Sequence, residues 1–151
     1  MAASGADMTT RDDIITAARG WIGTPYRHQA SAKGAGCDCL GLVRGVYREV
    51  VGAEPEAPPA YAPDWAEARS TSEAMAEAAR RHLIERAITD ATPGDVLLFR
   101  LNPQAVAKHA AILSSPGRMI HAYSGHAVTE TSLTPWWARR LAFVFSFPVG
   151  D

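Results

Sequence analysis

A single cysteine at a predicted helix start is the best candidate for a nucleophile in this sequence. Cys39 follows Asp38, a residue type that caps helices, and the apolar spacing of a helix begins there. The unpaired backbone N–H groups and the dipole of a helix start lower the pKa of a thiol. We therefore expect Cys39 to be reactive. The alternative is a small buried cysteine that only packs at the beginning of a helix.

Two histidines in the second half could supply the rest of such a site. His109 and His121 each lie inside an apolar run of alternating character, so their rings would face each other on adjacent strands. A catalytic thiol needs an imidazole to take its proton, and a third polar group to fix the tautomer and orientation of that imidazole. Together with Cys39, the two histidines provide one candidate for each part. Alternatively, each histidine is a satisfied core residue.

The first half of the chain has the apolar spacing of helices. One helix is expected over residues 9–22, and a second from Cys39 or just before it up to Gly52. Residues 53–64 contain four prolines, which indicates an exposed excursion without regular structure. One or two further helices are expected over residues 65–88. Their inward stripe would comprise Met75, Ala79, Leu83 and Ile88.

Short β-type runs follow the turn signal Thr92-Pro93-Gly94-Asp95. The expected strands span residues 96–100, 109–113, 119–123, 128–131 and 141–147. Helices followed by a meander of strands indicate an α+β fold, with N-terminal helices packed on an antiparallel sheet. A chain of 151 residues usually forms one core, so we expect a single domain over residues 1–151.

Composition argues against several classes of function. The net charge is −1 and the basic residues are scattered, so we expect no nucleic-acid partner. The chain has no uninterrupted apolar run of about 18 residues and no N-terminal basic and apolar signal, so we expect neither a membrane span nor export by its own signal. The two cysteines, Cys37 and Cys39, are too close in sequence for an unstrained disulfide, and we expect free thiols made in the cytoplasm.

An ordered set of motifs resembles the NlpC family of cell-wall cysteine peptidases. The motifs, which run from about Trp21 to Val128, are Thr24-Pro25-Tyr26-Arg27, Gly36-Cys37-Asp38-Cys39-Leu40-Gly41-Leu42-Val43, Pro93-Gly94-Asp95, His109 and Ile120-His121-Ala122. The resemblance implies a papain-like cysteine peptidase fold. It also implies that Cys39 is the nucleophile, His109 the base and His121 the residue that orients the base.

The same resemblance implies substrate-binding residues. Tyr26 matches the family tyrosine that borders the nucleophile and can donate a hydrogen bond, and we assign Asp38 with it to the substrate side of the site. A packed aromatic in the loop is the alternative for Tyr26. Two departures concern the pocket: Leu40 stands where the wider family usually has serine, and Cys37 where it prefers a larger apolar residue.

The implied reaction is hydrolysis of an amide in peptidoglycan stem peptides, commonly between D-glutamate and diaminopimelate, without a cofactor. Further matches resemble the branch found in phage tails and gene transfer agents: Tyr26-Arg27-His28-Gln29-Ala30, Cys37-Asp38-Cys39, Pro135-Trp136-Trp137 and Phe147-Pro148. This implies tail hub or fibre proteins as partners. It also implies carriage on a phage-like tail to the periplasm or cell wall.

Three other functions remain open. Cys37, Cys39, His109 and His121 are all residue types that bind zinc, but Cys-x-Cys spacing is poor for a tetrahedral site, so we expect no metal. A non-catalytic module that binds cell wall or belongs to a tail would keep the fold without turnover. Acyl transfer on lipids is a use of related Cys/His folds, although the order of cysteine before histidine favours a peptidase.

Overall fold

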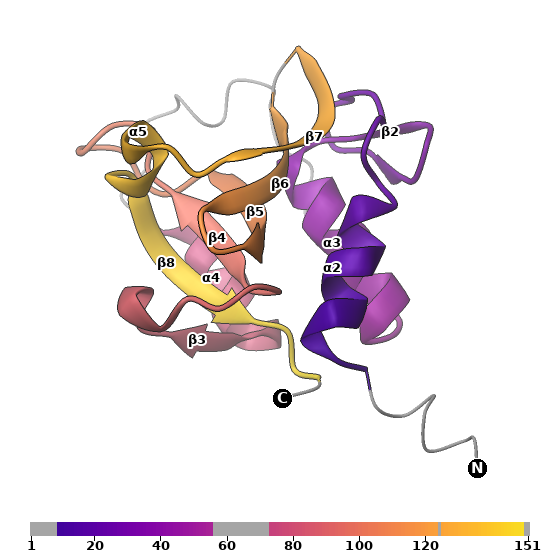
Figure 1. Cartoon of the computed structure of the whole chain (residues 1–151), viewed down its shortest axis with the longest axis horizontal. Coiled ribbons are helices and arrows are strands. Elements are labelled where there is room, and N and C mark those ends of the chain that lie inside the picture. The colour runs from indigo at the N-terminus through magenta and orange to yellow at the C-terminus, as the bar shows by residue number, and fades with distance from the viewer. Residues whose placement is uncertain (1–8, 56–72, 124, 150–151) are drawn as a thin grey trace.

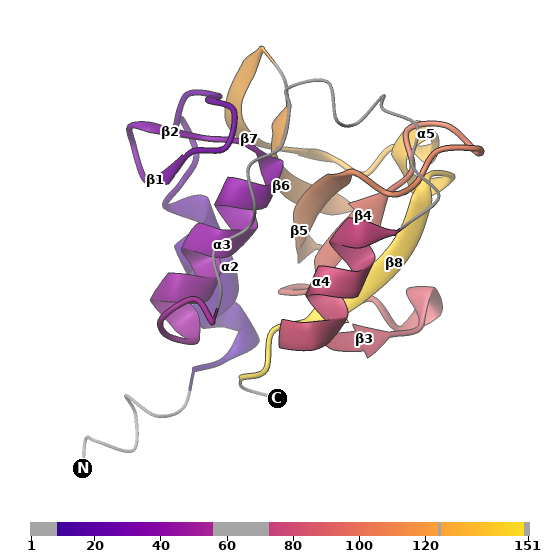
Figure 2. The same cartoon turned by 180° about the vertical axis from the view of Figure 1, so that it is seen from behind.

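A computed structural model describes residues 9–55, 73–123 and 125–149. Two helices, α2 (Arg11–Arg19) and α3 (Cys39–Val50), lie side by side and pack against a curved sheet (Figure 1). Helix α4 (Ala74–His82) lies near strands β3 and β8, as the reverse view shows (Figure 2). Among the helices in these ranges, none is long and apolar enough to cross a bilayer.

Helix α2 begins at a capping box. The Thr10 side chain accepts a hydrogen bond from the backbone N–H of Asp13, and the Asp13 carboxylate accepts one from the backbone N–H of Thr10. The helix was expected over residues 9–22, and it ends at Arg19 because residues 20–22 form turns. Its buried side, with Ile14 and Ala18, faces the core.

Helix α3 packs closely because it has glycines where neighbouring groups approach. A Cβ on Gly45 would lie 2.0 Å from the Trp21 ring, and a Cβ on Gly41 would lie 1.9 Å from the carbonyl oxygen of Ala30. Neither position has room for a side chain. The Trp21 indole N–H also donates a hydrogen bond to Glu49 at 2.7 Å. This bond links the turn that follows α2 to the last turn of α3.

The main sheet has six antiparallel strands in the order β3-β8-β4-β5-β6-β7. Their bounds are β3 Ile84–Arg86, β4 Val96–Phe99, β5 His109–Ser115, β6 Arg118–Tyr123, β7 His126–Ser132 and β8 Leu141–Ser146. A small hairpin, β1 (Ser31–Ala32) with β2 (Gly36–Cys37), precedes α3. All five expected strands are present with slightly different ends, and the expected α+β class is confirmed.

The prediction of helix up to Ile88 is wrong. Helix α4 ends at His82, the next residue Leu83 is extended, and β3 then pairs with β8. Ile88 lies in a short 3-10 helix (Ile88–Asp90) and is 45% exposed, so it does not belong to an inward stripe. An open edge beside β8 supplies backbone partners, and this tertiary pairing overrides the helical propensity of the segment. Residues 65–72 of the expected helix and 56–64 of the proline-containing stretch lie outside the described residues.

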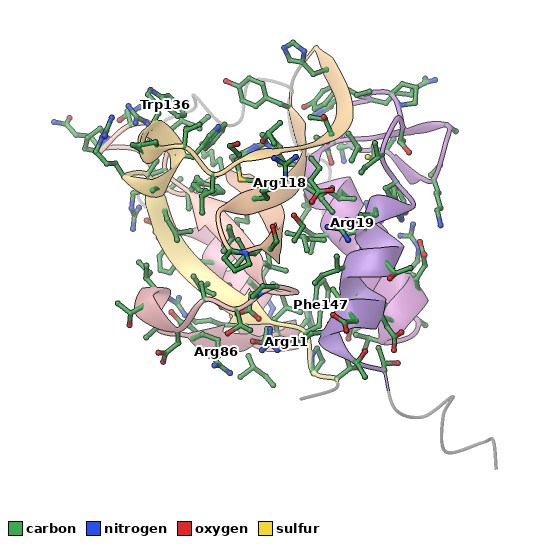
Figure 3. The ribbon with its side chains drawn as sticks, in the orientation of Figure 1. Arg11, Arg19, Arg86, Arg118, Trp136 and Phe147 are labelled. Atoms are coloured by element: carbon green, nitrogen blue, oxygen red, sulfur yellow. The ribbon has the colours of Figure 1, made fainter. Side chains whose placement is uncertain are left out.

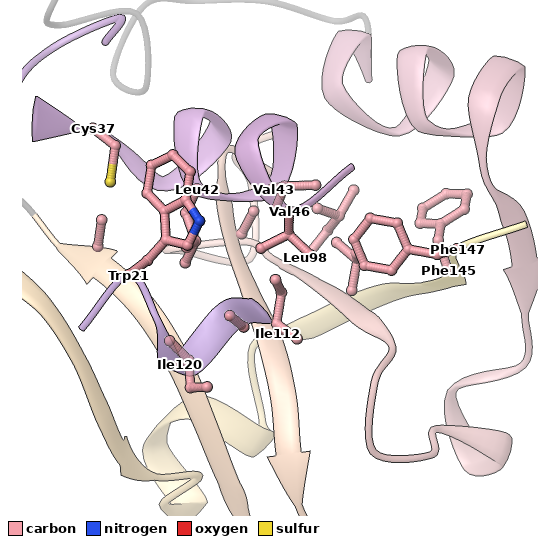
Figure 4. Close-up of a cluster of buried hydrophobic side chains, with 14 of the residues drawn as sticks. Trp21, Cys37, Leu42, Val43, Val46, Leu98, Ile112, Ile120, Phe145 and Phe147 are labelled. Carbon is pink, nitrogen blue, oxygen red and sulfur yellow. The ribbon is translucent and has the colours of Figure 1, made fainter. Parts of the chain in front are cut away.

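The central strands β4 and β5 are buried on both faces. One cluster packs between the sheet and the helices; Figure 4 shows Trp21, Leu42 and Val46 near Ile112 and Ile120. The opposite face has its own cluster, which includes Leu97, Phe99, Ala111, Leu113, Met119 and Val144. Because strand side chains alternate, His109 points to the same face as Ala111, away from α2 and α3.

The Pro93-Gly94-Asp95 turn has a structural role. Asp95 is fully buried, and its Oδ1 accepts hydrogen bonds from the Arg11 guanidinium at 2.6 Å and the Ser146 hydroxyl at 2.7 Å. Its Oδ2 accepts one from the Thr92 backbone N–H at 2.9 Å. Arg11 lies beside the end of β8 near Phe147 (Figure 3). One carboxylate therefore joins the start of α2 to two separate segments of the sheet.

Candidate active site

The cysteine lies at the first position of α3, as expected. Asp38 caps the helix: its Oδ1 accepts a hydrogen bond from the backbone N–H of Gly41, and its Oδ2 accepts one from the backbone N–H of Gln29, both at 2.7 Å. Gln29 has a φ of 64°, a left-handed conformation unusual for a residue other than glycine. The bond to Asp38 helps to hold that strained turn against the helix start. The thiol of Cys39 is half-buried and free.

The two histidines face each other, as their strands predicted. Nε2 of His109 lies 2.9 Å from Nδ1 of His121, and both residues are buried. The other nitrogen of His121, Nε2, lies 3.1 Å from the hydroxyl of Thr131 on β7. Only Nδ1 of His109 is then left to accept a proton from elsewhere.

The thiol does not reach this imidazole directly. Sγ of Cys39 makes a hydrogen bond of 3.8 Å to the carbonyl oxygen of Lys108, the residue before His109. Within the part of the chain that the structure describes, no hydrogen bond joins Sγ to the His109 ring. Catalytic hydrogen bonds are often long before substrate binds. Proton transfer requires the thiol to leave the Lys108 carbonyl and meet Nδ1.

The electrostatic state of the site differs from the expectation of a low thiol pKa. Burial and then the Asp38 charge raise the pKa of Cys39 to about 12, and backbone hydrogen bonds oppose this only in part. Burial, followed by the nearby His121, lowers the pKa of His109 to about 3. Burial and His126 lower the pKa of His121 to about 4. The resting site therefore holds a neutral thiol and two neutral imidazoles at neutral pH.

Aromatic rings surround the histidine pair. Trp137 stacks on His109 with ring centroids 5.0 Å apart and meets His121 edge-on at 5.5 Å. Tyr123 also meets His109 edge-on, at 5.6 Å. Trp137 comes from α5 (Pro135–Ala138), a short helix capped by Thr134. No local pattern in the sequence indicates that this tryptophan contacts the histidines, because the fold brings α5 to β5 from a distant part of the chain.

Tyr26 lies near the thiol. Its backbone forms an isolated bridge with Cys37, and its half-buried side chain packs at the border of the helix-side core. Burial, followed by the charges of Cys39, Asp38 and Cys37, raises the pKa of Tyr26 to about 12. The phenol therefore stays protonated at neutral pH and can donate a hydrogen bond. This geometry is compatible both with a role in substrate binding and with simple packing.

A groove of about 680 Å³ opens at His121. It lies between the β6–β7 hairpin and α5, and its lining residues are His121, Tyr123, His126, Ala127, Thr129, Thr131, Ser132, Thr134, Trp136 and Trp137. None of these lining residues is an aspartate, glutamate, lysine or arginine. Trp136 is 42% exposed and carries the Arg140 guanidinium over its ring at 3.7 Å (Figure 3).

The second thiol does not join the first in a metal site. Cys37 is fully buried in the helix-side core, in contact with apolar side chains (Figure 4). Among the described residues, no three potential ligands of the His, Cys, Asp or Glu types converge on one point. Of the four candidate zinc ligands, His109 and His121 lie together, 2.9 Å apart, whereas Cys37 lies in the helix-side core.

A model of the NlpC/P60 family matches residues 23–145. The chain belongs to the NlpC/P60 family. It is 29% identical over 144 residues to the gamma-DL-glutamyl hydrolase of Bacillus subtilis strain 168, a match that covers 94% of this chain and 31% of that protein. The chain thus spans about a third of the length of this relative.

Solved structures share the fold. The NlpC/P60 domain of the peptidoglycan hydrolase SagA superimposes with a TM-score of 0.63 at 25% identity and covers 91% of this chain and 99% of that chain. An NlpC/P60 family protein from Bacillus cereus ATCC 10987 has a TM-score of 0.66 at 20% identity, over 93% of this chain and 41% of that one. The expected papain-like fold is confirmed.

Proposed function

We propose that the protein is a cysteine peptidase that hydrolyses an amide bond in the stem peptide of peptidoglycan. In this proposal Cys39 is the nucleophile, His109 the base and His121 the residue that orients the base. The observation that supports it best is the bonded pair of neutral histidines beside a cysteine at a helix start. Membership of the NlpC/P60 family and similarity to a domain named a peptidoglycan hydrolase point the same way.

The reaction follows from the free nitrogen of His109. Nδ1 takes the thiol proton as Sγ of Cys39 bonds to the amide carbon, and the resulting imidazolium then protonates the leaving amine as the C–N bond breaks. Water, deprotonated by His109, next hydrolyses the thioester and restores the thiol. The backbone at Cys39, Leu40 and Ala110 acts to lower the pKa of the thiol and so favours its thiolate form.

The bond that we propose is the one between D-glutamate and diaminopimelate. A relative over nearly the whole of this chain is named a gamma-DL-glutamyl hydrolase, which supports a glutamyl residue on the acyl side. We propose that the protonated Tyr26 hydroxyl donates a hydrogen bond to the substrate. Asp38 contributes to the same side of the site by holding the Gln29 turn against the helix start.

We also propose delivery by a phage-like tail, with hub or fibre proteins as partners and the periplasm or cell wall as the place of action. This part rests on the sequence motifs that resemble the tail branch. Its test is co-purification of the chain with tail particles from cells that produce them. Particles that lack the chain would contradict it.

Digestion of purified muropeptides, with product masses read afterwards, tests the proposed activity. The wild-type protein should release a fragment that ends in D-glutamate, and Cys39→Ala should release none. A non-catalytic cell-wall module predicts a different result: both proteins would bind insoluble peptidoglycan, and neither would change the masses of muropeptides. Release of lipid-derived acyl groups instead would favour the acyl-transfer alternative.

A further inference from the structure

On the side of His121 that faces away from His109, the ring meets a hydroxyl group. His121 is buried, and its Nε2 lies 3.1 Å from Oγ1 of Thr131, which stands on the edge strand β7. The aromatic rings of Trp137 and Tyr123 also lie against His121, and His126 is near enough to lower its pKa. Among the described residues, the Thr131 hydroxyl is the group within hydrogen-bond distance of Nε2, and it can accept from an N–H there.

Once His109 accepts the thiol proton, the positions of the hydrogens on His109 and His121 are determined. When His109 holds the thiol proton, both of its nitrogens carry hydrogen, so its Nε2–H donates to Nδ1 of His121. Nδ1 of a neutral His121 must then be an acceptor, and its hydrogen must be on Nε2. That hydrogen points at Oγ1 of Thr131. The ion-pair state of the reaction thus needs an acceptor where Thr131 lies.

The same tautomer is needed before the reaction begins. If His121 carried its hydrogen on Nδ1, it would donate to Nε2 of His109, and His109 would carry its own hydrogen on Nδ1. That nitrogen is the one that must accept the thiol proton. The wrong tautomer of His121 would therefore block the base without moving any heavy atom.

We propose that Thr131 is a positioning residue that keeps His121, and through it His109, in the tautomer that can accept the thiol proton; this inference rests on the proposed function. Thr131 acts through His121 and does not touch the reacting atoms. Its own hydroxyl hydrogen can donate to water in the groove that Thr131 lines. The hydrogen-bonded series His109, His121 and Thr131 thus runs from β5 across β6 to the edge strand β7.

The kinetic test compares Thr131→Val with Thr131→Ser on one defined muropeptide. Valine keeps the β-branched shape that suits a strand but removes the acceptor, whereas serine keeps the hydroxyl. In Thr131→Val the buried Nε2–H of His121 loses its hydrogen-bond partner. This loss should lower kcat by roughly tenfold and leave KM nearly unchanged. Thr131→Ser should recover most of the rate. Equal loss in both variants, or an unchanged kcat in Thr131→Val, would overturn the proposal.

A second readout does not depend on turnover. Nitrogen NMR shifts of the histidine side chains report which ring nitrogen carries hydrogen. We expect hydrogen on Nε2 of both His109 and His121 in the wild type and in Thr131→Ser, and a shift toward Nδ1 in Thr131→Val. Thr129→Val, which removes another hydroxyl from β7 opposite His121, should keep the wild-type pattern.

The two readouts separate the two proposals. If the wild type shows the expected nitrogen pattern and Thr131→Val changes it, while no muropeptide is cleaved, then Thr131 positions the histidines but the proposed function is wrong. If kcat falls in Thr131→Val with no change in the nitrogen pattern, the loss is structural and the tautomer proposal is wrong.

Discussion

The two halves of the candidate site are held in different ways. Cys39 is placed mainly by contacts with the main chain: the Asp38 carboxylate accepts hydrogen bonds from two backbone N–H groups, and glycines in α3 admit close contact with the helix. The histidines are placed by side chains from three different elements, through one ring–ring hydrogen bond and the stacking of Trp137. The helix start therefore tolerates few changes in the main chain, whereas the proton relay depends on a few side chains that can be altered singly.

The largest effect should come from substitution of a cysteine. Comparing the two cysteines tests whether the position at the helix start makes Cys39 the nucleophile. Cys39→Ala should abolish hydrolysis of cell wall, whereas Cys37→Ala should retain most activity because Cys37 is buried in the core. Cleavage of suspended cell walls, followed by turbidity, measures both variants after each is shown to be folded. A comparable loss in both would refute the assignment of the nucleophile.

The next largest effect concerns the relay. General acid–base catalysis contributes roughly 10²–10⁴ in rate, so His109→Ala should lower kcat/KM by about that factor. His121→Gln keeps a group that can accept the hydrogen bond from His109, so this variant should retain measurable turnover. The kcat/KM of His121→Ala should lie between those of His121→Gln and His109→Ala. If His121→Gln is as inactive as His109→Ala, the two roles are wrongly assigned.

A smaller effect is expected from the aromatic cover. Trp137→Ala removes the ring that stacks on His109, and because Trp137 is half-buried the free energy of unfolding should fall by about 2–3 kcal/mol. Water then reaches His109, so its pKa should rise from about 3 toward the ordinary 6.5. Denaturant unfolding and NMR titration measure the two effects. Trp136→Ala is the matched control, since Trp136 makes no ring contact with His109 among the described residues, and its titration should match the wild type.

The dependence of stability on pH is a smaller effect for each histidine taken singly. Both histidines have folded-state pKa values below the ordinary 6.5, about 3 for His109 and about 4 for His121, so the unfolded chain binds more protons below pH 6.5. The neutral pair therefore makes its full contribution to the free energy of unfolding above pH 6.5. This contribution is lost as the pH falls below 6.5. Between pH 6.5 and 5 the loss should be about 1–2 kcal/mol per histidine.

Comparison with a double variant isolates this effect. His109→Gln with His121→Gln should show a flatter dependence of unfolding free energy on pH than the wild type over the same range. Parallel curves for the two proteins would contradict the lowered pKa values.

The difference between the two regions also explains what the sequence could predict. The cap at Asp38, the helix that follows it and the facing of His109 and His121 come from local spacing and strand alternation, and the structure has all three. Strand β3 was missed because its pairing depends on the open edge beside β8. Trp137 and Thr131 were missed because only the folded sheet brings them to the histidines.

The pKa of the Cys39 thiol likewise could not be predicted from the sequence. A helix start predicts a lowered thiol pKa, but the burial of Cys39 and the charge of Asp38 raise it. Spacing along the chain shows neither the burial of a group nor its distance from a charge.

Alkylation of the thiols, mapped residue by residue, tests most directly whether Cys39 is the nucleophile. The protein is treated with iodoacetamide for increasing times, and each sample is divided between an assay of muropeptide cleavage and peptide mapping by mass spectrometry. Activity should fall in proportion to modification of Cys39 and reach zero when Cys39 is fully modified, while a metal chelator has no effect. Activity that survives complete modification of Cys39, or that follows modification of Cys37 instead, would contradict the account.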